Sequence, residues 1–258
     1  MRIATWNVNS LKVRLPKVEE WLAYAQPDVL CMQETKLADS AFPALAFSAL
    51  GYESAHHGEG RWNGVAILSR VGLDGIVAGF FDQAEDESAE ARLLWATCAG
   101  VRVASIYVPN GRMVGTEHYE AKLTWLERLR RHIETECDPT AKLVICGDFN
   151  VAPEDRDVWD PTKLHGGTHV SAPEREAVAA LRRWGLSDVF RERYQESGVY
   201  SWWDYRAGDF HQGRGLRIDL MLATKPLAER ATWALIDRQA RKGKLPSDHA
   251  PLLADFDV

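Results

Sequence analysis

The sequence predicts one α/β domain built of stacked layers. Short apolar runs rich in β-branched residues alternate with amphipathic stretches of helical period, which is typical of sheets covered by helices. The chain has 258 residues, 46% of them hydrophobic, which is enough for a core of several layers without disulfides or metals. It shows neither a Pro/Ser-rich linker nor a repeat of solenoid spacing. We therefore expect a single domain over residues 1–258.

Seven segments are expected to form strands. Most are apolar at consecutive positions, as expected where a sheet is covered on at least one face. In chain order they are residues 2–7, 27–33, 64–69, 101–108, 142–149, 216–223 and 250–256.

Three helices are clear from the pattern. Pro16 suits the start of the first helix, since proline fits the first helical turn. Residues 119–133 carry apolar side chains at three- and four-residue steps and form the second. The third begins at the capping-box pattern of Ser171 and Glu174 and stops at Gly185.

The loops differ in character. The acidic segment 81–90, with Glu85, Asp86 and Glu87, is expected to be mobile. Residues 160–170 and 204–215 form long loops that contain glycine and are well suited to binding.

Charge and cysteine usage limit the functional class. A net charge of −6 argues against non-specific polyanion binding by the whole surface. Local basic clusters remain, and each is either a solvated surface or a phosphate-binding patch: Arg206, Arg214 and Arg217 form one, and Arg238, Arg241, Lys242 and Lys244 the other. The four cysteines form no CxxC pair, which favours reduced core thiols. Without an apolar signal core or a run of about 18 apolar residues, we expect a cytoplasmic protein with no membrane contact.

Polar residues lie at the ends of the apolar segments, where a strand alone does not need them. Each has an ordinary explanation, such as a turn for Asn7 or a surface ion pair with Lys36 for Glu34. Together they indicate one shared site, because an acid within a run as apolar as that around Asp219 is costly to bury unpaired. The full set is Asn7, Glu34, Tyr107, Asn110, Asp148, Asn150, Asp219, Asp248 and His249.

The donor types favour a hard cation. Glu34 and Asp248 offer carboxylate oxygens and Asn7 a neutral oxygen, which suits Mg²⁺ or Mn²⁺ and not zinc. A serine hydrolase is poorly supported because no G-x-S-x-G motif occurs. Four loop histidines without acceptable zinc-ligand spacing could imitate a zinc cluster: His56, His57, His165 and His169.

These groups predict water attack on a phosphodiester. Asp148 would hold and deprotonate the water, which contributes roughly 10²–10⁴ in rate for a well-placed base. His249 would donate to a phosphoryl oxygen, and Asp219 would fix its tautomer. A metal facing Asp248 would stabilise charge on the phosphate and on the leaving oxygen.

The motifs resemble those of the exonuclease–endonuclease–phosphatase superfamily, most closely its exodeoxyribonuclease III and abasic-endonuclease branch. "GDFN" and "SDH" are weak alone, whereas "QETK", "SWWDYR" and "GLRIDLML" in one chain are specific to the DNA-repair branch. The resemblance covers nearly the whole chain in family order through "TWNVNS", "PDVLCMQETK", "NGVAILSR", "YVPNG", "GDFNVAP", "PEREAVAALRRWGLSDVFR", "YSWWDYR", "RGLRIDLMLA" and "PSDHAPL".

The resemblance implies a four-layer α/β sandwich of two mixed sheets flanked by helices, and it assigns site residues. The implied metal site comprises Asn7, Glu34, Asp148, Asn150, Asp248 and His249. The implied catalytic residues are Tyr107, Asp148, Asn150, Asp219 and His249. The implied DNA-binding residues are Asn110, Arg112, Trp202, Arg214, Leu216 and Ile218.

Two positions depart from relatives. Leu216 stands where some have a tryptophan in the pocket for an extruded abasic sugar, and Asn9 stands where some have an aspartate near the metal. The net charge of −6 and the acidic loop around Glu85, Asp86 and Glu87 would weaken binding to undamaged DNA. We therefore expect damage-specific incision ahead of processive exonuclease activity.

We expect a Mg²⁺-dependent monomeric enzyme, with Mn²⁺ as a substitute, that incises double-stranded DNA 5′ to abasic sites. The resemblance also implies removal of 3′ blocks and 3′→5′ exonuclease activity. The alternatives are a phosphoesterase of the same fold that acts on a lipid or small phosphate ester, and a catalytically silent DNA-binding module.

Overall fold

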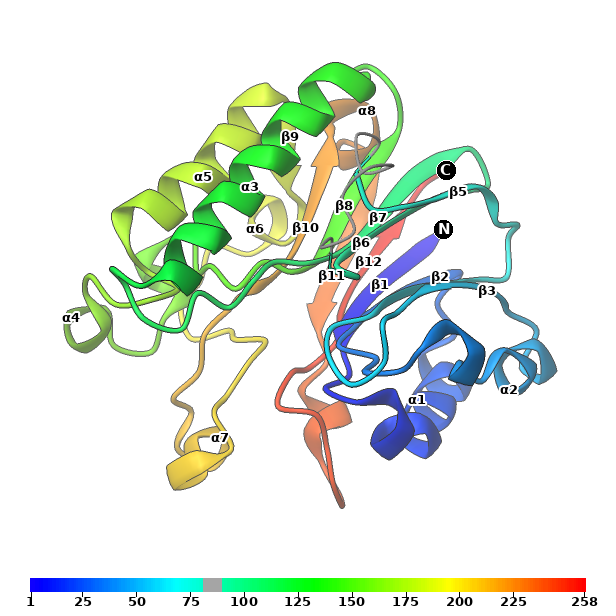
Figure 1. Cartoon of the computed structure of the whole chain (residues 1–258), viewed down its shortest axis with the longest axis horizontal. Helices are drawn as coiled ribbons and strands as arrows, with labels where there is room; N and C mark the ends of the chain where they lie inside the picture. The colour runs from blue at the N-terminus through cyan, green and yellow to red at the C-terminus, as the bar shows by residue number, and fades with distance from the viewer. Residues whose placement is uncertain (81–89) are drawn as a thin grey trace.

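The computed structural model describes residues 1–80 and 90–258, so the acidic segment around Glu85, Asp86 and Glu87 lies outside the described residues. Two six-stranded sheets pack face to face, and helices cover their outer faces (Figure 1). This arrangement confirms the expected four-layer sandwich. Within the described part of the chain, no helix is long and apolar enough to cross a membrane.

The first sheet has the order β11-β12-β1-β2-β4-β3. β1 lies parallel to β2 and antiparallel to β12, and the remaining pairs are antiparallel. The strands are β1 Arg2–Asn7, β2 Val29–Gln33, β3 Glu53–His57, β4 Val65–Ser69, β11 Ala231–Ile236 and β12 Leu252–Phe256.

The second sheet has the order β5-β6-β7-β8-β10-β9. β7 and β8 are parallel, and the remaining pairs are antiparallel. The strands are β5 Asp74–Ala78, β6 Leu93–Cys98, β7 Val101–Tyr107, β8 Leu143–Asp148, β9 Leu186–Asp188 and β10 Asp219–Thr224.

The helices are α1 Leu11–Ala25, α2 Ala44–Ala49, α3 Glu117–Glu136, α4 Pro161–Leu164, α5 Ala172–Trp184, α6 Val189–Arg193, α7 Asp209–Gln212 and α8 Lys225–Ala228. The expected capping box of Ser171 and Glu174 is present at the start of α5, and Gly185 caps its end. The start expected for α1 is wrong, because Pro16 lies inside the helix. The tertiary bond from the Leu11 amide to the Thr35 carbonyl, 3.0 Å, fixes the chain where α1 begins.

Three apolar clusters join the layers. Side chains of both sheets form the middle one, which includes Ile3 and Val144. α3 and α5 pack on the second sheet, and α1 and α2 pack on the first. Cys31 and Cys146 lie in the middle cluster as free, buried thiols, as expected. Burial of this apolar surface is the main term that holds the layers together.

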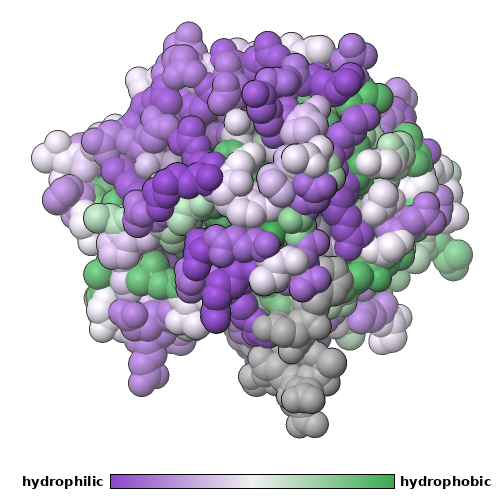
Figure 2. Space-filling model, turned by 90° about the horizontal axis from the view of Figure 1, so that it is seen from above, coloured by the Kyte–Doolittle hydropathy of each residue, from purple (hydrophilic) through white to green (hydrophobic). Residues whose placement is uncertain are grey.

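One face of the molecule is largely polar. Figure 2 shows the molecule from above, where hydrophilic side chains predominate and hydrophobic ones lie among them. Exposed apolar residues are normal on a protein surface.

The strand ends bring the predicted polar residues to one edge of the sandwich. Asn7 ends β1, Tyr107 ends β7 and Asp148 ends β8, and in the ladders Asp148 is paired with both Tyr107 and Asp219. The strand expected over residues 216–223 begins only at Asp219. The preceding residues leave the ladder because Leu216 exchanges backbone hydrogen bonds with Trp202.

Candidate active site

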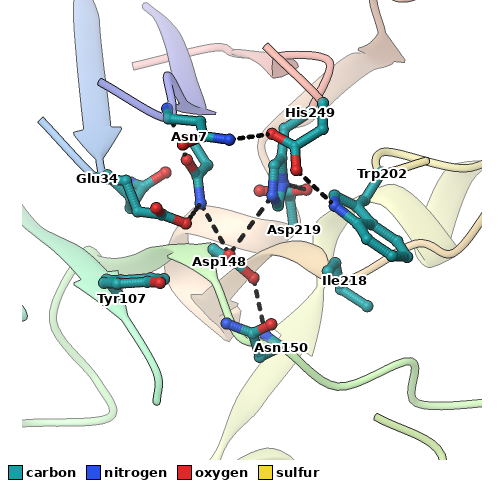
Figure 3. Close-up of polar contacts among 12 residues, drawn as sticks. Asn7, Glu34, Tyr107, Asp148, Asn150, Trp202, Ile218, Asp219 and His249 are labelled. Carbon is teal, nitrogen blue, oxygen red and sulfur yellow. Dashed lines mark hydrogen bonds and ion pairs between the residues drawn. The ribbon is translucent and has the colours of Figure 1, made fainter. Parts of the chain in front are cut away.

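Two acids and a histidine from three separate segments meet at this edge (Figure 3). Potential ligand atoms of Glu34, Asp148 and His249 all lie within 4.8 Å of one another, the only such His/Cys/Asp/Glu group among the residues that the structure describes. Glu34 follows β2 in a left-handed conformation with φ 51°. Asp148 and His249 are 1% and 3% exposed. Such a group suits a hard divalent cation. The four histidines expected in loops form no zinc cluster in the described part of the chain, and two of them, His56 and His57, lie in strand β3 instead.

Asn7 lies between the two acids. Its Nδ2 donates to Glu34 Oε1 and to Asp148 Oδ2, at 2.9 Å each (Figure 3). Its Oδ1 accepts from the Asn9 amide at 2.9 Å. In this arrangement Asn7 orients the carboxylates, and its oxygen would reach a metal only after the amide turned.

His249 is fixed by Asp219. Its Nδ1 lies 2.8 Å from Asp219 Oδ2, and its Nε2 lies 3.7 Å from Asp148 Oδ2. Burial alone would lower the pKa of His249, but the negative charges of Asp219 and Asp148 outweigh it and raise the pKa to about 10. The ring is therefore a cation aimed at the space beside Asp148.

The buried Asp148 carboxylate has more negative than positive charge around it. Its burial and the nearby charges of Asp219 and Glu34 raise its pKa to about 7, although the positive charge of His249 and the hydrogen bond from Asn7 oppose this. A divalent cation beside Glu34 and Asp148 would relieve that penalty. The residues present therefore fit Mg²⁺ or Mn²⁺.

Asp248 accepts hydrogen bonds from two neighbouring side chains. Its Oδ1 accepts from Asn9 Nδ2 at 2.9 Å and its Oδ2 from Trp202 Nε1 at 3.0 Å. Burial would raise the pKa of Asp248, but His249 and these two donors keep it below the usual range. Asn9, the predicted departure, also accepts from Lys36 Nζ at 2.6 Å, and this lysine pairs with Glu34 at 2.8 Å. Lys36 thus places a positive charge beside Glu34.

Asn150 and Tyr107 border the acids. The backbone amide of Asn150 donates to Asp148 Oδ1 at 2.9 Å. The side-chain oxygen of Asn150 accepts from Asn110 Nδ2 at 3.1 Å. Burial, with the charges of Glu34 and Asp148, raises the pKa of Tyr107 well above its ordinary value. Its hydroxyl therefore stays protonated and can act as a donor.

A buried ion pair that the sequence analysis missed supports the loop after β8. Lys122 and Glu174 are both fully buried and form a salt bridge. Lys122 Nζ also donates to the carbonyl of Asn150 at 2.6 Å and to that of Asn110 at 3.3 Å. The available signal was a lysine on the apolar side of helix α3, between Tyr119 and Leu126.

The predicted apolar wall exists, but much of it is covered. Leu216 and Ile218 are 5% and 2% exposed and pack in one cluster with Ala152, Val158 and Val170. Trp202 packs against this cluster and is partly exposed. The His169 ring lies 6.3 Å from the Trp202 ring, and His169 Nδ1 lies 2.6 Å from the Asn150 carbonyl. This wall therefore offers little free surface to a ligand.

Arg112 and two arginines of the first basic cluster, Arg214 and Arg217, differ in availability. Arg217 is fully buried and bonds to Asp157 and Asp188, so it cannot be a solvated or phosphate-binding residue. Asp157 and Asp188 are distant from Arg217 in the sequence, and only the fold brings these two acids to this one cation. Arg214 bonds to Asp209 at 2.6 Å, while Arg112 is exposed beside Asn110.

The layered sheets and the buried acid–histidine group define a metal-dependent phosphoesterase. The model of the Endonuclease/Exonuclease/phosphatase family matches residues 4–249. The chain belongs to this family, which confirms the resemblance seen in its motifs.

Relatives and solved structures narrow the comparison. Exodeoxyribonuclease III of Haemophilus influenzae is 34% identical over 268 aligned positions, covering 99% of this chain and 100% of the relative. An AP endonuclease from Archaeoglobus fulgidus is 40% identical with a TM-score of 0.95 over 100% of both chains. A 3′ phosphatase, NExo, from Neisseria bound to a product DNA hairpin is 38% identical with a TM-score of 0.95 over 100% of both chains.

Proposed function

We propose that this DNA-repair nuclease is a Mg²⁺-dependent phosphodiesterase that cuts double-stranded DNA 5′ to abasic sites and clears blocked 3′ ends. The observation that carries the proposal is the approach of Glu34, Asp148 and His249 ligand atoms to within 4.8 Å. All three come from one chain, which fits an enzyme active as a monomer. We expect it to act in the cytoplasm.

The metal would be held by Glu34 and Asp148, with Asn7, Asn150, Asp248 and His249 around them. A bound Mg²⁺ would stabilise negative charge on the scissile phosphate, and Mn²⁺ has similar ligand preferences. Asp248 accepts hydrogen bonds from Asn9 and Trp202, so its part in the site includes fixing the orientation of the Trp202 ring.

Asp148 and His249 together would carry out the proton chemistry. Asp148, with its raised pKa, would accept a proton from the attacking water. His249 would donate from Nε2 to a phosphoryl oxygen, because Asp219 holds Nδ1. Charge that develops on the phosphate thus meets a cation that is already in position.

Two neutral groups would complete the site. Asn150 is held by Asp148, Val108 and Asn110, so its amide is fixed for contact with the transition state. Tyr107 would donate a hydrogen bond from its hydroxyl to a phosphate oxygen, because its raised pKa keeps the hydroxyl protonated. Both act without changing charge.

Two kinds of DNA lesion are supported as substrates. The AP endonuclease at 40% identity supports abasic incision, and the 3′ phosphatase at 38% supports 3′-end processing. An abasic sugar would use Trp202, Leu216 and Ile218 as its wall, with Asn110, Arg112 and Arg214 near the phosphates.

A specific observation favours 3′-end processing as the stronger activity. Leu216 and Ile218 are almost fully covered, and His169 lies beside Trp202. An extruded sugar would have to open this cluster, whereas a terminal phosphate needs no extrusion. Loss of the packing would offset part of the binding free energy of the sugar.

The test is a comparison of three duplexes with Mg²⁺ and with EDTA. One carries an internal abasic analogue, one a 3′-phosphate at a nick, and one an undamaged recessed 3′ end. Metal-dependent conversion of either damaged duplex faster than the plain end supports the proposal, and the ratio of the two ranks the activities. If all three duplexes stay intact, the DNA substrates are wrong. A lipid or small phosphate ester would then be the substrate class, and a silent DNA-binding module would bind these duplexes without cutting any ester.

A further inference from the structure

We propose that His56, stacked on Phe42 and close to Asp39, is a positioning residue for Glu34 and acts through the hydroxyl of Thr35. The inference rests on the proposed function, because it takes Glu34 as a metal ligand. Neither His56 nor Asp39 reaches the acids themselves. They would set where the Glu34 carboxylate lies, and so how tightly the cation binds.

The segment that carries Glu34 has an unusual backbone. Glu34 and Lys36 have φ angles of 51° and 53°, and the facing Asn63 has 53°. Non-glycine residues seldom adopt this left-handed region, and each costs about 1 kcal/mol or more unless its surroundings hold it. The position of Glu34 therefore depends on contacts that fix its neighbours.

Backbone bonds fix this segment from both sides. The amides of Thr35 and Lys36 donate to the carbonyls of Gly64 and Asn63, at 3.1 and 2.9 Å. The Glu34 carbonyl accepts from the Ser10 amide at 2.7 Å. The side chain between Glu34 and Lys36 is thereby directed away from the cation site and into the protein.

The Thr35 side chain contacts the buried imidazole of His56. Thr35 Oγ1 lies 2.8 Å from His56 Nε2, and His56 Nδ1 lies 2.7 Å from Asp39 Oδ1. Phe42 stacks on the imidazole with ring centroids 4.4 Å apart and planes 18° apart. The His56 side chain is 5% exposed, so packing holds the ring in this orientation.

The protonation state suits the same arrangement. Burial lowers the pKa of His56, despite the nearby charge of Asp39. The ring is then neutral near pH 7, and a proton on Nδ1 beside Asp39 leaves Nε2 to accept from the Thr35 hydroxyl. The Asp39 carboxylate is 61% exposed and lies beside Nδ1 without hydrogen-bond geometry, so its effect on the ring is electrostatic.

Two glycines make room for these contacts. A Cβ at Gly64, where φ is 91°, would lie 2.1 Å from Thr35 Oγ1. A Cβ at Gly58 would lie 2.2 Å from the Leu37 carbonyl oxygen and 2.3 Å from His56 Cε1. Side chains other than hydrogen at either position would force Thr35 or His56 to move. The close fit is therefore at Thr35 and His56, the two residues nearest Glu34 on this path.

The three residues lie in the order of a Thr-His-Asp triad, but they are not a second catalytic centre. Thr35 is 0% exposed, and Gly64 lies against its hydroxyl. A nucleophile must reach its substrate, and this hydroxyl has no open side. The geometry is that of a support.

The test measures metal binding directly. Mn²⁺ is titrated into DNA-free protein, and free Mn²⁺ is followed by electron paramagnetic resonance. His56→Phe keeps a ring against Phe42 and removes the acceptor, while Thr35→Val removes the hydroxyl. We expect each to raise the Mn²⁺ dissociation constant about ten-fold, the lower end of the loss seen when a group orienting a ligand is removed. The double variant should lose no more than either single one.

Controls separate positioning from folding. His57→Phe makes the same change on the other face of β3 and should bind Mn²⁺ like the wild type. Thr35→Ser and His56→Gln retain polar groups at the contact and should recover most of the affinity. Urea unfolding of each variant shows that the titration is made on folded protein.

The outcomes distinguish the positioning role of His56 from the proposed metal site itself. Wild-type Mn²⁺ affinity in folded His56→Phe would overturn the positioning role while leaving the metal site intact. Equal binding by the wild type and Glu34→Gln would overturn the proposed metal site, and this inference with it.

Discussion

His249 Nδ1 lies 2.8 Å from Asp219 Oδ2, and the two side chains are only 4% and 0% exposed. Because both are sealed from water, the carboxylate fixes the ring orientation and keeps it protonated. The other ring nitrogen is thereby turned toward Asp148. His249 is thus set to donate towards a phosphate and not to activate a side-chain nucleophile. This explains why the adjacent Asp248 and His249, which precede strand β12, need no serine or cysteine partner.

Asp219→Asn should slow the chemical step by roughly 10²-fold, because a neutral amide no longer favours the charged imidazole. His249→Ala should lose about as much, roughly 10²–10³. Single-turnover cleavage with saturating enzyme measures this step apart from binding. A rate constant unchanged in either variant would remove the donor role from His249.

The stability of the metal-free protein should report the charge on His249. Its pKa of about 10 in the folded state lies above the ordinary 6.5, so its charge stabilises the fold fully below pH 6.5. That contribution is lost as pH rises through about 10. The wild type should therefore exceed His249→Gln in unfolding free energy by most at pH 6, and the gap should shrink by a few kcal/mol toward pH 10. Urea unfolding in EDTA measures the gap, and parallel pH profiles would contradict the assignment.

Asp148→Asn should abolish turnover and leave DNA binding largely intact, since it removes the proton acceptor while preserving shape. Fluorescence anisotropy and single-turnover cleavage on the same duplex measure the two properties. Asp138→Asn, a change at an exposed aspartate, is the matched control and should behave like the wild type. More than a few per cent of the wild-type rate in Asp148→Asn would refute Asp148 as the base.

Lys122→Met should destabilise the protein by about 3–5 kcal/mol, because it leaves the buried Glu174 carboxylate unpaired. Adding Glu174→Gln should restore part of that loss. Lys225→Met, which breaks an exposed pair with Glu229, should change stability by less than about 1 kcal/mol. Urea unfolding compares the four proteins. Equal effects of Lys122→Met and Lys225→Met would mean that the buried pair does not hold the loop of Asn150.

The layered fold and the main site residues could be predicted because local pattern and motif point the same way. Apolar runs ending in Asn7, Tyr107 and Asp148 form strands that end at one edge. The resemblance supplied the role of Tyr107 and the sandwich, which spacing alone could not give.

What escaped prediction depends on contacts between distant residues. Arg217 seemed a surface charge until the fold brought Asp157 and Asp188 to it. Pro16 suggested a helix start, but a bond between Leu11 and Thr35 places the start earlier. Partners of this kind are separated by many residues and leave no local signal.

The most direct test of the central claim is single-turnover cleavage of duplexes that carry an abasic analogue or a 3′-phosphate, by the wild type and Asp148→Asn, with Mg²⁺ and with EDTA. The account predicts product only from the wild type with Mg²⁺. Cleavage that persists in EDTA, or in purified Asp148→Asn, would show that the reaction does not depend on a metal beside Glu34 and Asp148.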